Sequence, residues 1–142
     1  MKQIFFTMML LFYSSLALAD DEILDLIKVS DGDTIQVMLN GEKQALRMLN
    51  IDCFESDKRP RAIKQSEYYH LSLGKVIEKG LYSKQVLKDL LRKEKKVRVK
   101  WDKKDRYKRL LGVVYRLDGL NINEYMLKSG GCNEYVEFSY KK

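Results

Sequence analysis

A hairpin signal at Asn40-Gly41 constrains this 142-residue chain more than any other feature. A type I′ turn needs positive φ at both central positions, which Asn and Gly tolerate. The flanking residues 34–39 and 44–51 are therefore predicted to pair as antiparallel strands. Another apolar run, residues 22–29, precedes them. The first part of the chain is predicted to be a three-stranded antiparallel meander.

Two helices are predicted downstream of the meander. Apolar side chains recur at helical spacing through residues 74–92. Gly80 costs about 1 kcal/mol inside a helix, so the firm part of this prediction is residues 81–92. Asn123 is predicted to be the N-cap of a second, short helix that runs to Lys128.

The remaining segments complete the expected fold. Residues 56–73 are polar and basic, contain the only proline, and are predicted to form a mobile loop. Residues 97–101 and 110–117 are predicted to be two further strands. This order of elements is typical of an α+β fold, mainly β, in which a five-stranded OB-type barrel packs with two or three helices.

The start of the chain predicts export. Lys2 precedes an apolar stretch at residues 4–18, and small residues close it just before Asp20. This pattern predicts a secretory signal peptide over residues 1–19, because the apolar stretch is shorter than the ~20 residues of a membrane-spanning helix. We therefore expect the protein to be periplasmic or secreted, with residues 20–142 as one domain.

The charge of the chain favours a polyanionic partner. Removing residues 1–19 lowers Lys+Arg from 27 to 26 and leaves Asp+Glu at 20, so the net charge falls from +7 to +6. A basic exported domain is suited to binding nucleic acid, although many basic proteins are merely soluble.

Acidic side chains lie at the ends of two predicted strands, and two arginines lie on or beside predicted strands. Asp33 closes an acidic glycine turn, while Asp52 and Glu55 follow the strand that carries Arg47. Alternation along that strand predicts that Arg47 and Asp52 point to opposite faces. Arg109 directly precedes a later apolar strand. Two acidic strand ends and two arginines are the parts of a metal-assisted phosphoryl site.

The available ligands indicate a hard cation. Carboxylates offer only oxygen atoms, and a chain with a single His cannot build a His-rich zinc or iron site, so Ca²⁺ or, less readily, Mg²⁺ is implied. Carboxylates beside glycine are also ordinary turn residues, and a solvated arginine is an ordinary surface residue. The coincidence of Asp33 with Asp52 and Glu55 favours a site. A Ser–His–Asp or Cys–His mechanism would have only His70 available.

In this order the residues resemble the staphylococcal nuclease (thermonuclease) family. Asp31-Gly32-Asp33-Thr34 is similar to the family's first acidic turn, and residues 47–55 to its Arg…Asp-x-Pro-Glu segment. Asp105-Arg106-Tyr107-Lys108-Arg109 is similar to its Asp-x-Tyr-Gly-Arg loop. The resemblance runs from about residue 28 to residue 131. It implies an OB-fold, Ca²⁺-dependent endonuclease that acts on DNA and RNA and leaves 3′-phosphates.

The resemblance also implies roles for individual residues. The expected catalytic residues, which activate the attacking water or brace the phosphate, are Glu55, Arg47 and Arg109. The expected Ca²⁺ ligands are Asp33, Asp52 and the backbone carbonyl of Cys53. The expected substrate contacts are Arg106, Tyr107, Lys108 and Tyr135. For base stacking, Tyr107 is better placed than Tyr135, and Phe138 and Tyr140 are the other candidates.

Two positions depart from the family pattern, and two cysteines add a covalent prediction. Phe54 stands in place of the usual Pro, which removes a φ constraint beside Glu55, and Lys108 stands in place of the usual Gly. Cys53 and Cys132 are the only cysteines, and in an oxidising compartment they are predicted to form a disulfide. In the fold that the resemblance implies, residue 132 returns close to residue 53.

Two interpretations of function follow. The preferred one is an exported, monomeric nuclease that favours single strands and needs no stable protein partner. The alternative is a non-catalytic OB-fold module that binds single-stranded nucleic acid. A secreted structural or adhesive domain would explain the export and the charge but not the arginines. Because every matching acidic and arginine position is filled, the sequence favours the enzyme.

Overall fold

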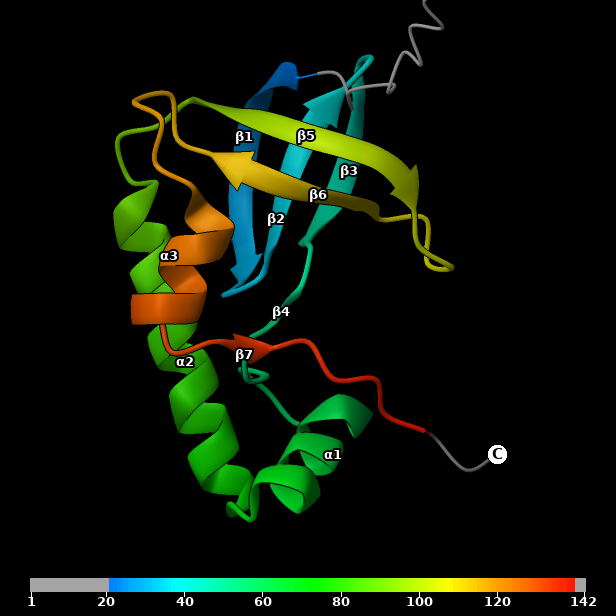
Figure 1. Ribbon diagram of the computed structural model, residues 1–142, viewed down its shortest axis with the longest axis vertical. Helices are drawn as coiled ribbons and strands as arrows, with labels where there is room; N and C mark the ends of the chain where they lie inside the picture. The colour runs from blue at the N-terminus through cyan, green and yellow to red at the C-terminus, as the bar shows by residue number, and fades with distance from the viewer. Residues whose placement is uncertain (1–20, 140–142) are drawn as a thin grey trace, which may run out of the picture.

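The computed structural model describes residues 21–139, and residues 1–20 and 140–142 lie outside that description (Figure 1). The predicted signal peptide, residues 1–19, falls outside the described residues, so its cleavage stays a prediction. Within residues 21–139, no helix is both long enough and apolar enough to cross a membrane.

Five strands close into a barrel, which occupies the upper half of Figure 1. Their order around the barrel is β1-β2-β3-β6-β5, and all neighbours are antiparallel except β3 and β6, which are parallel. The strands are β1 (Asp21–Asp31), β2 (Thr34–Leu39), β3 (Glu42–Met48), β5 (Lys96–Lys104) and β6 (Leu110–Tyr115). Both Asn40 and Gly41 have positive φ, as the hairpin required. The predicted five-stranded OB-type barrel is confirmed.

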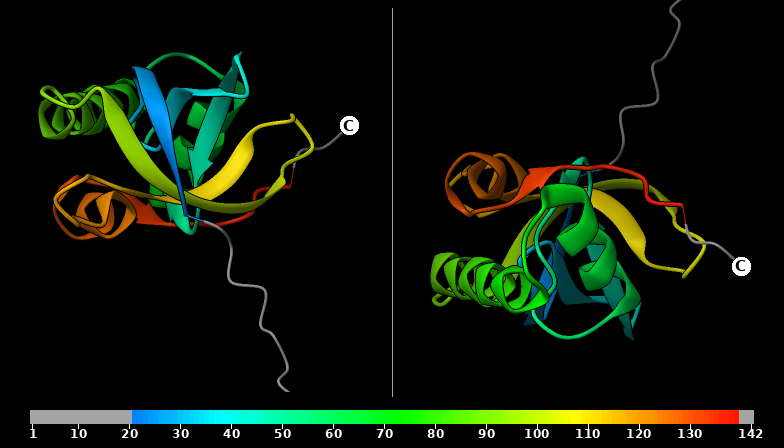
Figure 2. Two further views of the ribbon diagram at one scale, coloured as in Figure 1. Left: turned by 90° about the horizontal axis from the view of Figure 1, so that it is seen from above. Right: turned by 90° about the horizontal axis from the view of Figure 1, so that it is seen from below.

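Three helices and a two-stranded sheet complete the fold. The helices are α1 (Pro60–Tyr69), α2 (Leu73–Leu90) and α3 (Ile122–Ser129). The small sheet pairs β4 (Ile51–Asp52) with β7 (Asn133–Glu134) in antiparallel register. In both views of Figure 2, α2 and α3 lie side by side against one flank of the barrel. The small sheet lies between the barrel and α1 in Figure 1.

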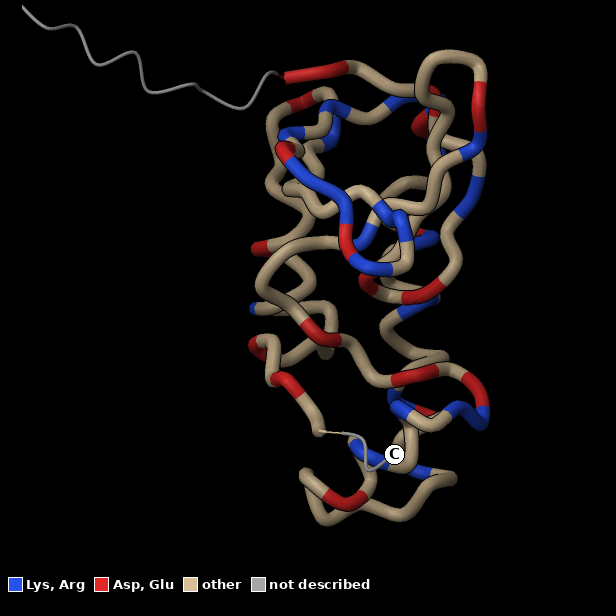
Figure 3. The backbone as a smooth tube through the Cα atoms, turned by 90° about the vertical axis from the view of Figure 1, so that its right-hand side faces the viewer, with Lys and Arg blue, Asp and Glu red and all other residues tan. Residues whose placement is uncertain are grey.

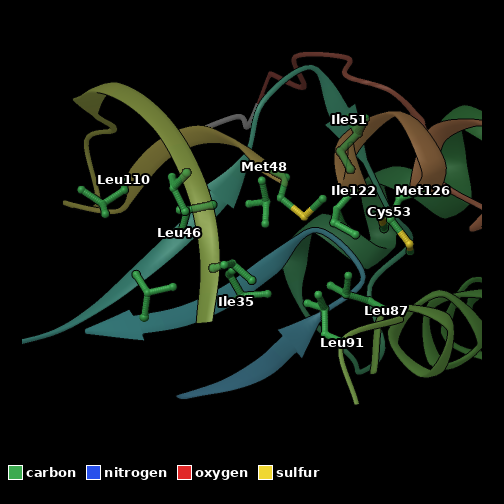
Figure 4. Packing of buried hydrophobic residues seen from close by; sticks show 14 of the residues in the cluster. Ile35, Leu46, Met48, Ile51, Cys53, Leu87, Leu91, Leu110, Ile122 and Met126 are labelled. Atoms are coloured by element: carbon green, nitrogen blue, oxygen red, sulfur yellow. The ribbon is translucent and has the colours of Figure 1, made fainter. Parts of the chain in front are cut away.

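The barrel interior is filled from alternate positions of its strands. Ile35 of β2, Leu46 of β3 and Leu110 of β6 are fully buried there (Figure 4). Since Leu46 pairs with Leu110 in the parallel register, the residues one position away from them face out of the barrel. Arg47 on β3 and Arg109, directly before β6, therefore lie on the same outer face of this strand pair.

The predicted loop at residues 56–73 is wrong, because α1 occupies most of it. Pro60 begins the helix, where its missing N–H leaves no intrahelical hydrogen bond unmade. The buried side chains of α1 are Ala62 and Gln65 rather than a stripe of large apolar residues. Periodicity of apolar residues therefore gave no signal for this helix.

Phe54 accounts for the position of α1 against α2. Its side chain is buried and packs with Ala62 of α1 and Val76 of α2 in a small second core. The edge of its ring also meets the ring of Tyr69, with centroids 5.3 Å apart. Phe54 thus replaces the backbone constraint of the usual Pro with a packing contact to two helices.

The predicted N-cap of α3 is wrong by two residues. Asn121 is the N-cap, and its side chain accepts a hydrogen bond from the backbone N–H of Glu124. Asn123 is buried instead: its Oδ1 accepts from the Val114 N–H and its Nδ2 donates to the Leu49 carbonyl. Both asparagines precede the same apolar run, so the sequence did not separate a helix cap from a buried link.

Candidate active site

A break in the strand after Arg47 brings the predicted site residues together. β3 ends at Met48, and Asn50 takes a φ of 65° before the chain resumes as β4. Asn is one of the few residues that tolerate this left-handed conformation. The prediction that Arg47 and Asp52 face opposite ways is therefore wrong, because the break reverses the alternation between them.

Arg47 joins two carboxylates that come from different loops. Its Nη1 lies 2.9 Å from Asp33 Oδ2, and its Nη2 lies 3.3 Å from Asp52 Oδ1. The Arg47 side chain is only 11% exposed, and that of Asp52 is fully buried. Charges this deeply buried are costly unless they are paired. Arg47 is therefore a built part of the site rather than a solvated surface arginine.

Asp33 fastens the acidic turn to the segment that follows β4. Its Oδ2 accepts a hydrogen bond from the Cys53 N–H at 2.8 Å, and its Oδ1 accepts one from the Thr34 hydroxyl at 3.0 Å. Burial raises the pKa of Asp33 above its ordinary value, although Arg47 and the Cys53 N–H oppose the rise. The structure thus places Asp33, Asp52 and Cys53 in one hydrogen-bonded unit.

Glu55 is a largely buried carboxylate with one long ion pair. Its side chain is 15% exposed, and its one recorded ion pair joins Oε2 to Arg59 Nη1 at 3.6 Å. No described residue donates a hydrogen bond to Glu55 Oε2. Burial raises the pKa of Glu55 from its ordinary 4.5 to about 7, and Asp31 and Asp33 add to the rise. A carboxyl with a pKa near neutrality is suited to accept and release protons.

The acidic residues form a group that we call the carboxylate cluster: Asp31, Asp33, Asp52 and Glu55. Each of the other three members raises the pKa of Glu55, which shows how close the negative charges are. Within residues 21–139, no three His, Cys, Asp or Glu side chains are arranged as a metal cage. The Cys53 carbonyl, another predicted ligand, accepts a hydrogen bond from Gln65 Nε2 at 3.0 Å. The cluster offers oxygen atoms without closing them around one point.

Sequence reasoning missed two side chains of α1 that reach Asp52. Arg61 Nε lies 3.1 Å from Asp52 Oδ1, and Gln65 Nε2 donates to Asp52 Oδ2 at 3.1 Å. Both residues fall in the segment predicted to be a mobile loop. Two signals were available in the sequence. Pro60 is suited to the first position of a helix, and Arg61 and Gln65 are four positions apart, which places them on one face of that helix.

α2 supports the site from behind at two small residues, Gly80 and Ser83. Gly80 is buried, and a Cβ at this position would clash with the backbone carbonyls of Phe54 and Glu55. A Cβ at Gly32 in the acidic turn would lie 2.7 Å from the Cβ of Ser83. α2 runs without interruption from Leu73 to Leu90, so Gly80 marks a close approach of the site rather than a weak point of the helix.

The predicted disulfide is confirmed. Cys53 and Cys132 are bonded across 79 positions of sequence, with their Cα atoms 4.1 Å apart. The bond ties the residue after β4 to the residue before β7, beside the two-stranded sheet. Because the Cys53 N–H contacts Asp33 and its carbonyl contacts Gln65, the disulfide anchors the centre of the site.

Arg109 contacts residues outside the carboxylate cluster. Its Nε pairs with Asp105 Oδ2 at 2.7 Å, and its guanidinium lies over the Tyr107 ring at 5.5 Å from the centroid. Burial raises the pKa of Asp105, but hydrogen bonds from the Arg109 backbone and side chain outweigh burial and lower this pKa below its ordinary value. Lys108, where the family usually has Gly, takes a φ of 63°, which costs roughly 1–2 kcal/mol for a residue with a Cβ.

The other predicted substrate contacts are exposed. Tyr107 is 65% exposed at the tip of the β5–β6 hairpin, where Arg106 lies over its ring. Figure 3 views the molecule from the side on which this hairpin projects and shows Lys and Arg along it. Tyr135 is 52% exposed after β7, and the Arg61 guanidinium lies 5.5 Å from its ring centroid.

Comparison with known proteins agrees with this geometry. The model of the family described as staphylococcal nuclease homologue matches residues 45–142, which is more than half of the chain. The chain belongs to this family. The match includes Arg47, Asp52, Glu55 and Arg109 but begins after Asp33. Asp33 is joined to the staphylococcal nuclease homologue region by its contacts with Arg47 and Cys53.

Several relatives are named endonucleases. An uncharacterized endonuclease of Escherichia coli O157:H7 is 33% identical over 113 residues, which cover 80% of this chain and 61% of that protein. An uncharacterized endonuclease of Haemophilus influenzae is 32% identical over 142 residues, covering 98% of this chain and 68% of its own length. Endonuclease YncB of Bacillus subtilis is 34% identical over 100 residues, 70% of this chain and 42% of that protein. The chain thus spans about three-fifths of the length of the Escherichia coli relative.

Proposed function

We propose that this protein is a Ca²⁺-dependent endonuclease of the thermonuclease type, which hydrolyses phosphodiester bonds in DNA and RNA and leaves 3′-phosphates. The observation that carries the proposal is the buried Arg47 between Asp33 and Asp52, beside a Glu55 whose pKa lies near 7. Membership of the staphylococcal nuclease homologue family and the names of the relatives support it.

The carboxylate cluster fits Ca²⁺ by its chemistry. Glu55 Oε2 is buried with no hydrogen-bond donor among the described residues, and its ion pair with Arg59 Nη1 is 3.6 Å long, so the protein compensates its negative charge only weakly. Ca²⁺ takes carboxylate and carbonyl oxygens in flexible geometry. Asp33, Asp52 and the Cys53 carbonyl would hold the ion, which would polarise the phosphoryl oxygen and stabilise charge in the transition state.

Glu55 would act as the base in hydrolysis. A water oxygen forms a bond to phosphorus while its proton passes to the Glu55 carboxylate, and the bond from phosphorus to the 5′ oxygen breaks. The leaving oxygen takes a proton from solvent, which gives a 3′-phosphate and a 5′-hydroxyl. Arg47 and Arg109 would donate hydrogen bonds to the phosphate oxygens, where negative charge grows during the reaction.

Single strands are the proposed preferred substrate. The exposed ring of Tyr107 and the neighbouring Arg106 and Lys108 offer a stacking surface and positive charge on one projecting hairpin. Stacking on an aromatic ring requires an unpaired base, and contacts to phosphates weaken as salt concentration rises. Tyr135 would offer a second exposed ring, and the Arg61 guanidinium of α1 lies 5.5 Å from its centroid.

One observation favours the alternative function, a module that binds single-stranded nucleic acid without cutting it. Asp52 is already paired with Arg47, Arg61 and Gln65, so its charge is neutralised by the protein alone. Glu55 distinguishes the two functions, because binding alone gives no reason to bury a carboxylate oxygen that receives no hydrogen bond from the described residues.

Digestion of labelled oligonucleotides tests the proposal. The substrates are single-stranded DNA, single-stranded RNA and a stable DNA hairpin, each with Ca²⁺ and with excess chelator. We expect cleavage of both single strands with Ca²⁺, slower cleavage of the hairpin stem, and no cleavage with chelator. Glu55→Gln should be inactive, whereas Glu78→Gln, an exposed glutamate on α2, should retain wild-type activity. Binding without cleavage by the wild type would support the alternative instead.

We also propose that the protein is exported to the periplasm or the medium as a monomer. The Cys53–Cys132 disulfide supports export, because disulfides persist in oxidising compartments. The intact mass of protein recovered from those fractions should correspond to a chain that begins at Asp20 with no free thiol. Recovery of the full-length, reduced chain from the cytoplasm would contradict export.

A further inference from the structure

Gln65 is fully buried, and within residues 21–139 its side-chain hydrogen bonds all go to residues 52–55. Its Nε2 donates to Asp52 Oδ2 at 3.1 Å and to the Cys53 carbonyl at 3.0 Å. Its Oε1 accepts a hydrogen bond from the backbone N–H of Glu55 at 2.9 Å. One amide group therefore contacts two proposed Ca²⁺ ligands, the Asp52 carboxylate and the Cys53 carbonyl, and the backbone of the proposed base, Glu55.

The partners fix the orientation of the Gln65 amide. Its nitrogen faces two acceptors, the Asp52 carboxylate and the Cys53 carbonyl, while its oxygen faces the Glu55 N–H. Rotating the amide by half a turn would place oxygen against two oxygens and an NH₂ group against an N–H. Only one orientation satisfies all three partners, so the amide holds them at a defined spacing.

Packing alone does not explain an amide at this position. The neighbouring buried residue of α1, Ala62, fills space against Phe54 and Val76 without polar groups. A polar amide is costly to bury unless its hydrogen bonds are made, and an apolar side chain of the same length would fill the same volume. What Gln65 adds is polar contact with Asp52, Cys53 and Glu55 at once.

We propose that Gln65 is a positioning residue for the reaction: it sets the placement of the Asp52 carboxylate, the Cys53 carbonyl and the Glu55 backbone relative to one another. This inference rests on the proposed nuclease function and assigns to α1 the task of ordering the site. Arg61, one helical turn earlier, gives Asp52 a second contact from the same face of α1. Gln65 would act through its contacts with Asp52, Cys53 and Glu55.

A positioning role predicts a change in turnover rather than in substrate affinity. Substrate is expected to bind through the β5–β6 hairpin and Tyr135, which Gln65 does not contact. Side chains that orient metal ligands typically change metal affinity or activity by about 10–100-fold when they are removed. Loss of the Gln65 amide should therefore lower kcat and weaken Ca²⁺ binding while leaving KM within about 3-fold.

The test compares Gln65→Met with Gln85→Met. Both remove an amide from a helix, but Gln85 is exposed on α2, and among the described residues its side chain donates only to Asp89. Steady-state cleavage of single-stranded DNA should show a 10–100-fold lower kcat for Gln65→Met and wild-type values for Gln85→Met. The rise in melting temperature on Ca²⁺ addition, measured without substrate, should need about tenfold more Ca²⁺ in Gln65→Met only. A folded Gln65→Met with wild-type kcat overturns the proposal.

Gln65→Glu covers the case in which Gln65→Met does not fold. Ionised glutamate has the same shape and still accepts from the Glu55 N–H, but it cannot donate to Asp52 or Cys53. We expect a folded protein whose kcat is at least about tenfold lower. A wild-type rate in Gln65→Glu would overturn the positioning role. If the wild type binds Ca²⁺ but cuts nothing, the proposed function fails, and the Ca²⁺ titration alone then decides whether Gln65 orders the site.

Discussion

Replacing Glu55 with Gln should stabilise the protein while it abolishes catalysis. The Glu55 carboxylate is 15% exposed, and burial and its acidic neighbours Asp31 and Asp33 raise its pKa from 4.5 to about 7. Gln keeps the shape of the side chain and removes the charge, at the loss of one ion pair with Arg59 at 3.6 Å. Arg59 is half exposed, so that pair contributes little.

The magnitude and the sign follow from the pKa of Glu55. Because the folded-state pKa is the higher one, the folded protein holds a proton that the unfolded chain releases between pH 4.5 and about 7. The contribution of Glu55 to the free energy of unfolding is therefore fully present below pH 4.5 and is lost as the pH rises towards about 7. A shift from 4.5 to about 7 corresponds to about 3 kcal/mol at roughly 1.4 kcal/mol per unit. Glu55→Gln should recover most of this above pH 7 and almost none at pH 4.5.

Urea unfolding of the metal-free protein across this pH range is the measurement. Wild type, Glu55→Gln and Glu78→Gln are compared with chelator present, so that no cation offsets the charge of the cluster. Glu78 is an exposed glutamate paired with Lys75, and its replacement should change stability by less than about 0.5 kcal/mol at any pH. A gain in Glu55→Gln that does not depend on pH, or a loss of stability at about pH 8, would refute the reasoning from buried charge.

Three further predictions concern the arginines, the disulfide and the helix behind the site. Arg47→Lys and Arg109→Lys should each lower kcat by at least ~10²-fold with the fold retained, because lysine keeps the charge but loses the paired donors; circular dichroism and cleavage assays check both. Replacing Cys53 and Cys132 together with Ser should lower the free energy of unfolding by up to about 4.5 kcal/mol, since the bond closes a loop of 79 positions; urea denaturation measures the loss. Gly80→Ala should lower activity more than Gly74→Ala on the same helix, because a Cβ at Gly80 meets the carbonyl of Glu55 whereas one at Gly74 meets nothing; equal activities would contradict the close approach.

Local sequence chemistry was sufficient for the barrel. The Asn40-Gly41 turn has the positive φ values that its residue types favour, and the strands on either side pair as predicted. In the second half, β5 contains the predicted run 97–101, and β6 covers the predicted run 110–117 up to Tyr115. These elements depend on turn geometry and on alternation of apolar residues, both of which act over a few neighbouring positions.

The site itself was predicted only in its composition. The sequence named Arg47, Asp52 and Glu55, but it placed Arg47 and Asp52 on opposite faces because it extended the strand through Asn50. The turn at Asn50, with its φ of 65°, cancels the alternation and lets Arg47 reach Asp52. A single residue in the left-handed region changes which side chains meet, and the alternation of side chains along a strand does not predict such a turn.

The chain by itself determined the hairpin, the barrel strands, the acidic and basic residue types of the site and the pairing of its two cysteines. Only the tertiary structure decided that α1 exists where a loop was expected and that its Gln65 and Arg61 hold Asp52. The physical reason is that this helix buries a polar side chain against polar partners ten or more positions away in the sequence. Periodicity records apolar burial, whereas a buried amide is recognised by the partners that only folding brings to it.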